Sequence, residues 1–175
     1  MDRRIESSAT SFSLPVRCCR WLYFIASWLL VAAVVAQFLL AGAGVFAPVD
    51  LCNLVPNRSV GCGFALHVWF GRFVISFLFV AILALCFAAR APRRTTALTS
   101  ALPGLFALQG LLVLPAGMGG PIRLVAALHV VNGLFILLVA LRVTGRAGQL
   151  LSEARRSTAR SLLDALPRSA EGERA

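Results

Sequence analysis

Four long apolar runs, each broken by few polar residues, set the pattern of the sequence. They cover residues 21–46, 64–89, 98–115 and 122–142. About 20 apolar residues suffice for a helix to cross the hydrocarbon core of a bilayer, and these runs approach or exceed that length. Lipid offers no partners to backbone hydrogen-bonding groups, so each run is expected to be an α-helix. The first run is too long for the apolar part of a signal peptide and is predicted to be an uncleaved span.

The composition indicates a membrane protein. Of the 175 residues, 59% are hydrophobic and only 14% are charged, and both values lie far from those of soluble domains. The formal charge of +10 comes entirely from arginine, because the chain has no lysine. A basic chain can bind nucleic acid. These arginines flank the apolar runs instead of lining one polar face, so no nucleic-acid partner is expected.

The positions of the arginines predict the orientation. Four precede the first run, three lie between the second and third runs, and seven follow from Arg142 onward, whereas the other two loops carry only Arg58 and Arg123. Loops rich in arginine stay in the cytoplasm. The sequence therefore predicts an all-α integral membrane four-helix bundle with both termini cytoplasmic. Its parts are a leader (1–20), a transmembrane domain (21–145) and a basic tail (146–175).

The basic tail has apolar residues at helical spacing with arginines between them. A short amphipathic helix lying on anionic lipid is one interpretation, and a frayed, solvated tail is an equal alternative. The leader up to Ser13 and the end from Ser169 are expected to be disordered.

Two stretches, HVWFGRF at 67–73 and HVVNGLF at 129–135, repeat one pattern and hold the only two histidines. The preceding helices contain QFLL from Gln37 and QGLL from Gln109, which is a weaker match because such segments are rich in leucine. Together the matches suggest a duplicated two-helix hairpin, with copies related by an axis along the membrane normal. Such an axis places the two histidines at similar depth, facing each other.

One count opposes equal depth. His67 precedes Arg90 by 23 positions, whereas His129 precedes Arg142 by 13. At about 1.5 Å per residue, the difference is roughly 15 Å. A fourth helix that ends nearer Arg146, or a tilted second helix, would reduce it.

Paired histidines of this kind suit a haem iron. Metal to imidazole bonds of about 2 Å put the two ligating nitrogens about 4 Å apart. The glycine four residues after each histidine lies on the same helix face and leaves room for a flat porphyrin. Polar residues inside a membrane are by default a site hypothesis. The candidate cofactor-binding residues are His67, His129, Gly71, Gly133, Gln37, Gln109, Asn132 and Arg72, with the histidines as axial ligands.

Each of these residues also has a simpler role open to it. The histidines could be structural and hydrogen-bonded, and the glutamines and Asn132 could join helices at about 0.6 kcal/mol per bond or fix an imidazole tautomer. Arg72 could neutralise a haem propionate or extend to the headgroups.

The cysteines divide by compartment. Cys52 and Cys62 lie in the first outer loop, where a disulfide could form, whereas Cys18 and Cys19 face the reducing cytoplasm and Cys86 lies in lipid. We expect the Cys52–Cys62 pair to be oxidised.

This arrangement resembles one half of the bacterial haem A synthases. Those proteins have eight spans, a duplicated four-helix bundle and paired histidine ligands to haem. The chain is also similar to a small family of single-bundle bacterial membrane proteins that keep the patterns AQ, H-x-x-x-G, LQ and LH-x-x-N-G. The resemblance covers about residues 21–145. It implies a bacterial cytoplasmic (inner) membrane location, His67 and His129 as axial ligands, and Cys52 with Cys62 as the loop pair.

The chain departs from the synthases at one position that matters for chemistry. They carry a catalytic glutamate shortly before the histidine of the second helix, where Phe64 and Leu66 stand here. The resemblance therefore does not extend to oxidation of a haem methyl group.

The function expected from these observations is binding of haem b, in electron transfer or haem handling at the outer face. A homodimer or a membrane redox partner is compatible with it. The competing expectation is a cofactor-free membrane scaffold or accessory subunit. The sequence has no Gly-rich phosphate loop with lysine, no His-Glu-x-x-His pattern and no carboxylate within a span, so it gives no support to the reactions that these patterns catalyse. Whether the protein is an enzyme stays open.

Overall fold

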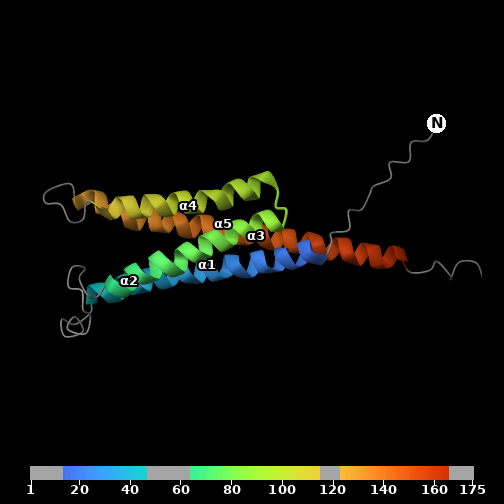
Figure 1. The fold of residues 1–175 in the computed structure, drawn as a ribbon, viewed down its shortest axis with the longest axis horizontal. Helices are drawn as coiled ribbons and strands as arrows, with labels where there is room; N and C mark the ends of the chain where they lie inside the picture. The colour runs from blue at the N-terminus through green and yellow to red at the C-terminus, as the bar shows by residue number, and fades with distance from the viewer. Residues whose placement is uncertain (1–13, 47–63, 115–122, 166–175) are drawn as a thin grey trace, which may run out of the picture.

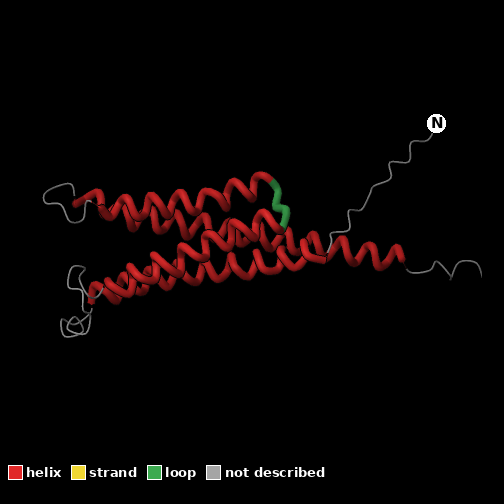
Figure 2. Tube along the Cα trace, viewed as in Figure 1, coloured by secondary structure: helices red, strands yellow, loops and turns green. Residues whose placement is uncertain are grey.

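The structure, a computed structural model, describes residues 14–46, 64–114 and 123–165, and these residues are helical except for short turns (Figures 1 and 2). Within this part of the chain, four helices are long and apolar enough to cross a membrane. The predicted all-α class and multi-pass membrane character are confirmed, while the cytoplasmic location of both termini stays a prediction. The elements are α1 (Leu14–Phe46), α2 (Ala65–Phe70), the π-helical turn η3 (Gly71–Ile75), α3 (Ser76–Ala88), α4 (Arg93–Val113) and α5 (Arg123–Ala165).

The helices form two hairpins. The first pairs α1 with the second helix, which comprises α2, η3 and α3, and the second pairs α4 with α5; α5 also packs along α1. Figure 1 shows the hairpins diverging toward the end where α2 lies and converging at the other end. At the divergent end, α2 packs on α1 and has no extensive packing against α4 or α5.

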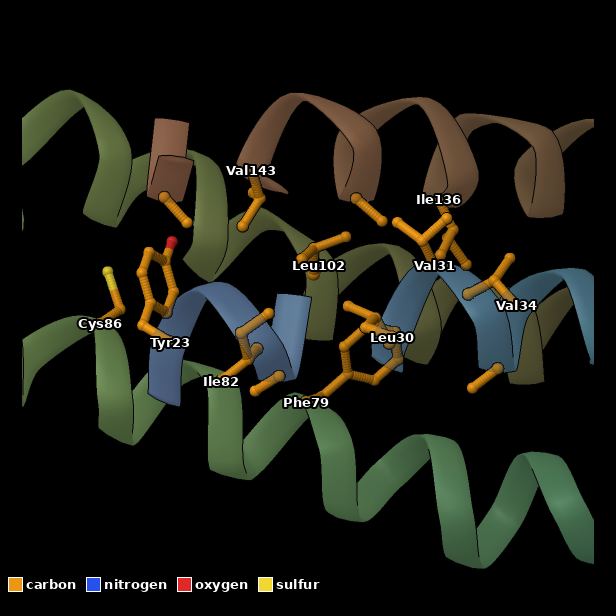
Figure 3. Close-up of a cluster of buried hydrophobic side chains, with 14 of the residues drawn as sticks. Tyr23, Leu30, Val31, Val34, Phe79, Ile82, Cys86, Leu102, Ile136 and Val143 are labelled. Carbon is orange, nitrogen blue, oxygen red and sulfur yellow. The ribbon is translucent and has the colours of Figure 1, made fainter. Parts of the chain in front are cut away.

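The convergent half holds the tightly packed core. Leu30, Ile82, Leu102 and Val143, from four different helices, are completely buried there (Figure 3). The outer surface is apolar as well, and Phe77 is 71% exposed. Apolar residues on both the inside and the outside are what a bundle surrounded by lipid requires.

A tight turn joins α3 to α4. Arg90 adopts a positive φ of 53°, and its N–H donates to the carbonyl of Phe87, while the N–H of Ala91 donates to that of Cys86. This pair of bonds is the Schellman motif, which satisfies the last carbonyls of a helix. Pro92 then directs the chain into α4.

The buried Arg20 corrects the depth count from the sequence. Its guanidinium donates to the carbonyls of Ala89 (3.3 Å) and Leu150 (3.0 Å), so these two residues lie at the same level. Ala89 is 22 positions after His67, and Leu150 is 21 after His129. The histidines are therefore level, and the count misled because α5 continues past Arg142.

The tail also differs from a separate short helix on the lipid surface. Residues 146–165 continue α5 without a break. Leu150, Leu151 and Ala154, part of the predicted apolar face, are buried, and this stretch lines a groove with the first two turns of α1. Helix α1 accordingly begins at Leu14, within the region expected to be a leader.

Candidate functional site

The two histidines meet between the hairpins at the divergent end. The ring centres of His67 and His129 are 6.4 Å apart, and the ring planes are inclined by 63°. Both imidazoles are partly buried. The structure thus brings together two residues 62 positions apart in the sequence, as the repeat predicted.

Each imidazole is held by its own hairpin in the same way. Nδ1 of His67 lies 3.0 Å from the backbone carbonyl of Gln37, and Nδ1 of His129 lies 3.1 Å from that of Gln109. A carbonyl can only accept, so Nδ1 carries the proton in both rings and Nε2 keeps a lone pair. The glutamine matches, which were weak evidence in the sequence, therefore mark equivalent positions.

The side chain of Gln37 turns toward His67. Its Nε2 donates to the backbone carbonyl of His67 at 2.9 Å and lies 3.3 Å from Nε2 of the same residue. Its Oε1 is buried and has no hydrogen-bond partner among the described residues. An unpaired buried acceptor is uncommon and costs free energy.

The side chain of Gln109 is used differently. Its Oε1 accepts a hydrogen bond of 2.6 Å from Nδ2 of Asn132, which also donates to the carbonyl of Leu105 at 2.8 Å. Asn132 is buried and joins α5 to α4. For Nε2 of His129, no hydrogen-bond partner occurs in the described part of the chain.

A cavity of about 90 Å³ lies between the two imidazoles and the core. Its polar lining is the two histidines and the two glutamines, and the remainder is apolar. The full lining is Val34, Gln37, Phe38, Ala41, His67, Ile75, Phe106, Gln109, His129, Val130, Gly133 and Ile136.

The glycines after each histidine make room for residues of the bundle itself. A Cβ on Gly71 would lie 2.7 Å from Nε2 of Gln37, and one on Gly133 would lie 3.1 Å from Cζ of Phe38 and 3.4 Å from Nε2 of Gln109. The sequence suggested that these glycines leave space for a porphyrin. The structure places side chains of the same bundle against them.

The other predicted site residues are not at the cavity. Arg72 is exposed on the surface of the second helix, and Asn132 acts through Gln109 instead of lining the space. The Cys52–Cys62 disulfide falls outside the described residues and stays a prediction. Among the described residues, no cluster of three or more His, Cys, Asp or Glu could hold a metal ion.

Sequence reasoning missed two features. One is the π-helical turn η3, which starts four residues after His67; such turns are often found at functional sites. The other is a buried hydrogen-bonded cluster in the convergent half. There the hydroxyl of Tyr23, the only tyrosine of the chain, lies 2.7 Å from Oγ1 of Thr99, and Thr99 donates to the carbonyl of Thr95. The sequence signal available for this cluster was the spacing of Thr95 and Thr99, which lie four residues apart on one helix.

Comparison with known proteins gives one match. A family model described as a family of unknown function (DUF6220) matches residues 37–117, which is less than half of the chain. The matched stretch contains Gln37, His67 and Gln109 and ends before His129. No curated protein and no solved structure matches. Over this stretch the chain is therefore similar to a family whose description assigns no activity.

Proposed function

We propose that this protein is a small multi-pass membrane protein that binds one haem b between its two hairpins, with His67 and His129 as the two axial ligands. The observation that carries the proposal is the matched pair of imidazoles. In both, the Nδ1 proton is donated to a backbone carbonyl, which leaves Nε2 as an electron-pair donor. Histidines that ligate metals characteristically bond their other ring nitrogen in this way, which fixes the tautomer and the ring orientation.

The separation of the rings fits a shared iron. Two iron–nitrogen bonds of about 2 Å each and a distance of about 1.1 Å from each nitrogen to its ring centre, given C–N bonds near 1.33 Å, add up to about 6.2 Å between ring centres in a linear arrangement. The observed value is 6.4 Å. The donor set therefore suits a six-coordinate iron and, with only two protein ligands, does not suit a closed zinc site.

The size of the cavity sets a condition on the proposal. At about 90 Å³ it is smaller than the roughly 300–1,000 Å³ of ordinary ligand pockets. Binding of a macrocycle therefore requires the apolar side chains around the cavity to move aside while the two imidazoles keep their spacing. Because α2 has no extensive packing against α4 or α5, that rearrangement would disrupt little helix packing.

Haem bound here would supply one-electron chemistry. The residues of this chain would orient the two imidazoles through Gln37 and Gln109 and surround the group with apolar side chains. A role in electron transfer or haem handling, in a bacterial inner membrane and at its outer face, is the function proposed, with a membrane redox partner or a second copy of the chain as partner.

Spectroscopy of the purified protein tests the proposal. The wild type, His67→Ala, His129→Ala and the control Gln149→Ala, which alters an exposed polar residue outside the cavity, are expressed in haem-replete cells and purified in mild detergent. Sharp visible bands are expected in reduced-minus-oxidised spectra of the wild type and the control, and their loss in both histidine variants. Colourless wild-type protein, or bands unchanged in both histidine variants, would refute haem ligation.

A second candidate, a cofactor-free scaffold, is favoured by a specific observation. Among the described residues, every side-chain hydrogen bond of the two glutamines and Asn132 joins the helices of a single hairpin, which is what residues with a purely structural role would do. In this case the wild type is colourless, and substitution of the histidines lowers only stability.

A further inference from the structure

A second site lies at the convergent, arginine-rich end of the bundle and is independent of the histidine pair. We propose that the groove between the first turns of α1 and the extension of α5 binds the headgroup of one anionic phospholipid. Two guanidinium groups, from Arg17 and Arg155, would hold its phosphate.

The groove is built by complementary faces of two helices. Leu14, Arg17, Cys18 and Trp21 follow each other at spacings of three, one and three residues along α1, so they share one face. Leu151, Ala154 and Arg155 do the same on α5. Together these seven residues line a space of about 140 Å³.

The floor and the rim of the groove differ in character. Leu151 and Ala154 are buried and form an apolar floor. Trp21 is 42% exposed at the start of the long apolar run, where tryptophan commonly marks the membrane interface. The guanidinium of Arg155 stacks over its ring, with Cζ 4.8 Å from the ring centre. Stacking leaves the edge of a guanidinium, which carries the N–H donors, free for a phosphate.

The charges around the groove favour an anion. Glu153 is the one carboxylate whose side chain the structure describes, and it interacts with Arg20. Two positions separate Glu153 from Arg155 on α5, which puts their side chains about 160° apart around the helix axis. Arg17 and Arg155 therefore border an apolar space with no described carboxylate on its lining. An apolar floor beneath two cations suits a lipid, which brings both an acyl chain and a phosphate.

The test measures lipid binding to the full chain in detergent by native mass spectrometry, with phosphatidylglycerol as the probe. The variants are Arg17→Gln, Arg155→Gln and the double variant. Arg156→Gln is the matched control, because it removes the same charge from the neighbouring position, which is exposed and does not line the groove. Each groove arginine is expected to contribute about fivefold in affinity, from the usual strength of an arginine near anionic lipid.

The expected result is therefore a loss of about fivefold in each single groove variant and about 25-fold in the double variant, with less than a twofold change in Arg156→Gln. Arg17→Gln leaves the stacking of Arg155 on Trp21 intact, so its result stands even if loss of that stacking disturbs α5. Equal weakening by Arg156→Gln would show attraction by net charge alone. Equal binding of phosphatidylcholine, whose phosphate is balanced by the choline cation, would show that the groove does not select an anionic headgroup. Either outcome overturns the proposal, as does displacement of the lipid by inorganic phosphate at equal concentration.

Cys18 provides a second readout inside the groove. Its thiol is exposed and free, so bound phosphatidylglycerol should slow its labelling by a maleimide, measured on the Cys18 peptide. The lipid concentration that gives half-maximal protection should rise about fivefold in Arg17→Gln. Labelling at the same rate with and without the lipid would contradict occupancy of the groove.

Discussion

The two hairpins position their histidines by the same backbone bond but use their glutamines in opposite ways. In the second hairpin, Asn132 gives Gln109 a donor for its Oε1. The equivalent position in the first hairpin, three residues after His67, is Phe70, which has no donor to offer. The amide of Gln37 turns to its own histidine instead, and its Oε1 is left without a partner. One residue of the repeat thus decides whether an imidazole Nε2 is engaged, as in His67, or has no described partner, as in His129.

Among the substitutions that test this difference between the hairpins, Asn132→Leu is expected to change the free energy of unfolding most. It removes the donor to Gln109 and leaves a partly buried Oε1 unpaired, so the free energy of unfolding should fall by about 2 kcal/mol. Unfolding in detergent micelles with increasing SDS measures the change. In a double-mutant cycle with Gln109→Leu, we expect a coupling of about 1 kcal/mol. The matched cycle of Phe70→Leu with Gln37→Leu should give a coupling near zero, and comparable coupling in both hairpins would remove the distinction between them.

Alanine at the two glycines should produce a smaller, unequal effect. The Cβ of Gly71→Ala meets Nε2 of Gln37 at 2.7 Å, so the amide must leave His67, at a cost of about 1 kcal/mol in the free energy of unfolding. In Gly133→Ala the nearest atom is Cζ of Phe38 at 3.1 Å, and a shift of the ring by a few tenths of an ångström should limit the loss to about 0.5 kcal/mol. The same SDS titration compares the two variants. A larger loss in the free energy of unfolding for Gly133→Ala than for Gly71→Ala would contradict the idea that Gly71 is needed to leave space for the amide of Gln37.

A further small effect is expected from the competition for His67. Because the amide of Gln37 lies 3.3 Å from Nε2 of His67, any ligand of this nitrogen must displace it. Gln37→Leu should therefore raise the affinity for haem by about threefold, equivalent to one weak hydrogen bond, whereas Gln109→Leu should not raise it. Haem titration followed by visible absorption measures both. Lower affinity in Gln37→Leu would mean that the amide assists ligation instead of competing with it.

The sequence predicted the helices and the histidine pair well, for physical reasons. Apolar runs of about 20 residues have no alternative to the helix in lipid, and the repeated H-V-x-x-G-x-F pattern put His67 and His129 in equivalent positions. The relative depth of the two could not be counted from arginines, because Arg142 lies on an exposed face of a helix that continues for more than 20 further residues. Long arginine side chains reach the headgroups from within a span, so they are poor markers of a helix end.

The parts of the site that the sequence did not predict depend on packing across the bundle. Which atom faces Gly71 follows from the rotamer of Gln37, and this in turn depends on Phe70 replacing the asparagine of the other hairpin. The π-helical turn beside His67 has no local sequence signature. The groove of α1 and α5 arises only because the tail continues α5 along α1 instead of leaving it.

Electron paramagnetic resonance of the haem-loaded ferric protein tests the central claim most directly, since the spin state reports the number and kind of axial ligands. One low-spin species is predicted for the wild type, and a high-spin species for both His67→Ala and His129→Ala, because each variant lacks one of two strong ligands. A high-spin wild type, or a low-spin signal that survives in both variants, would show that the two imidazoles do not share one iron.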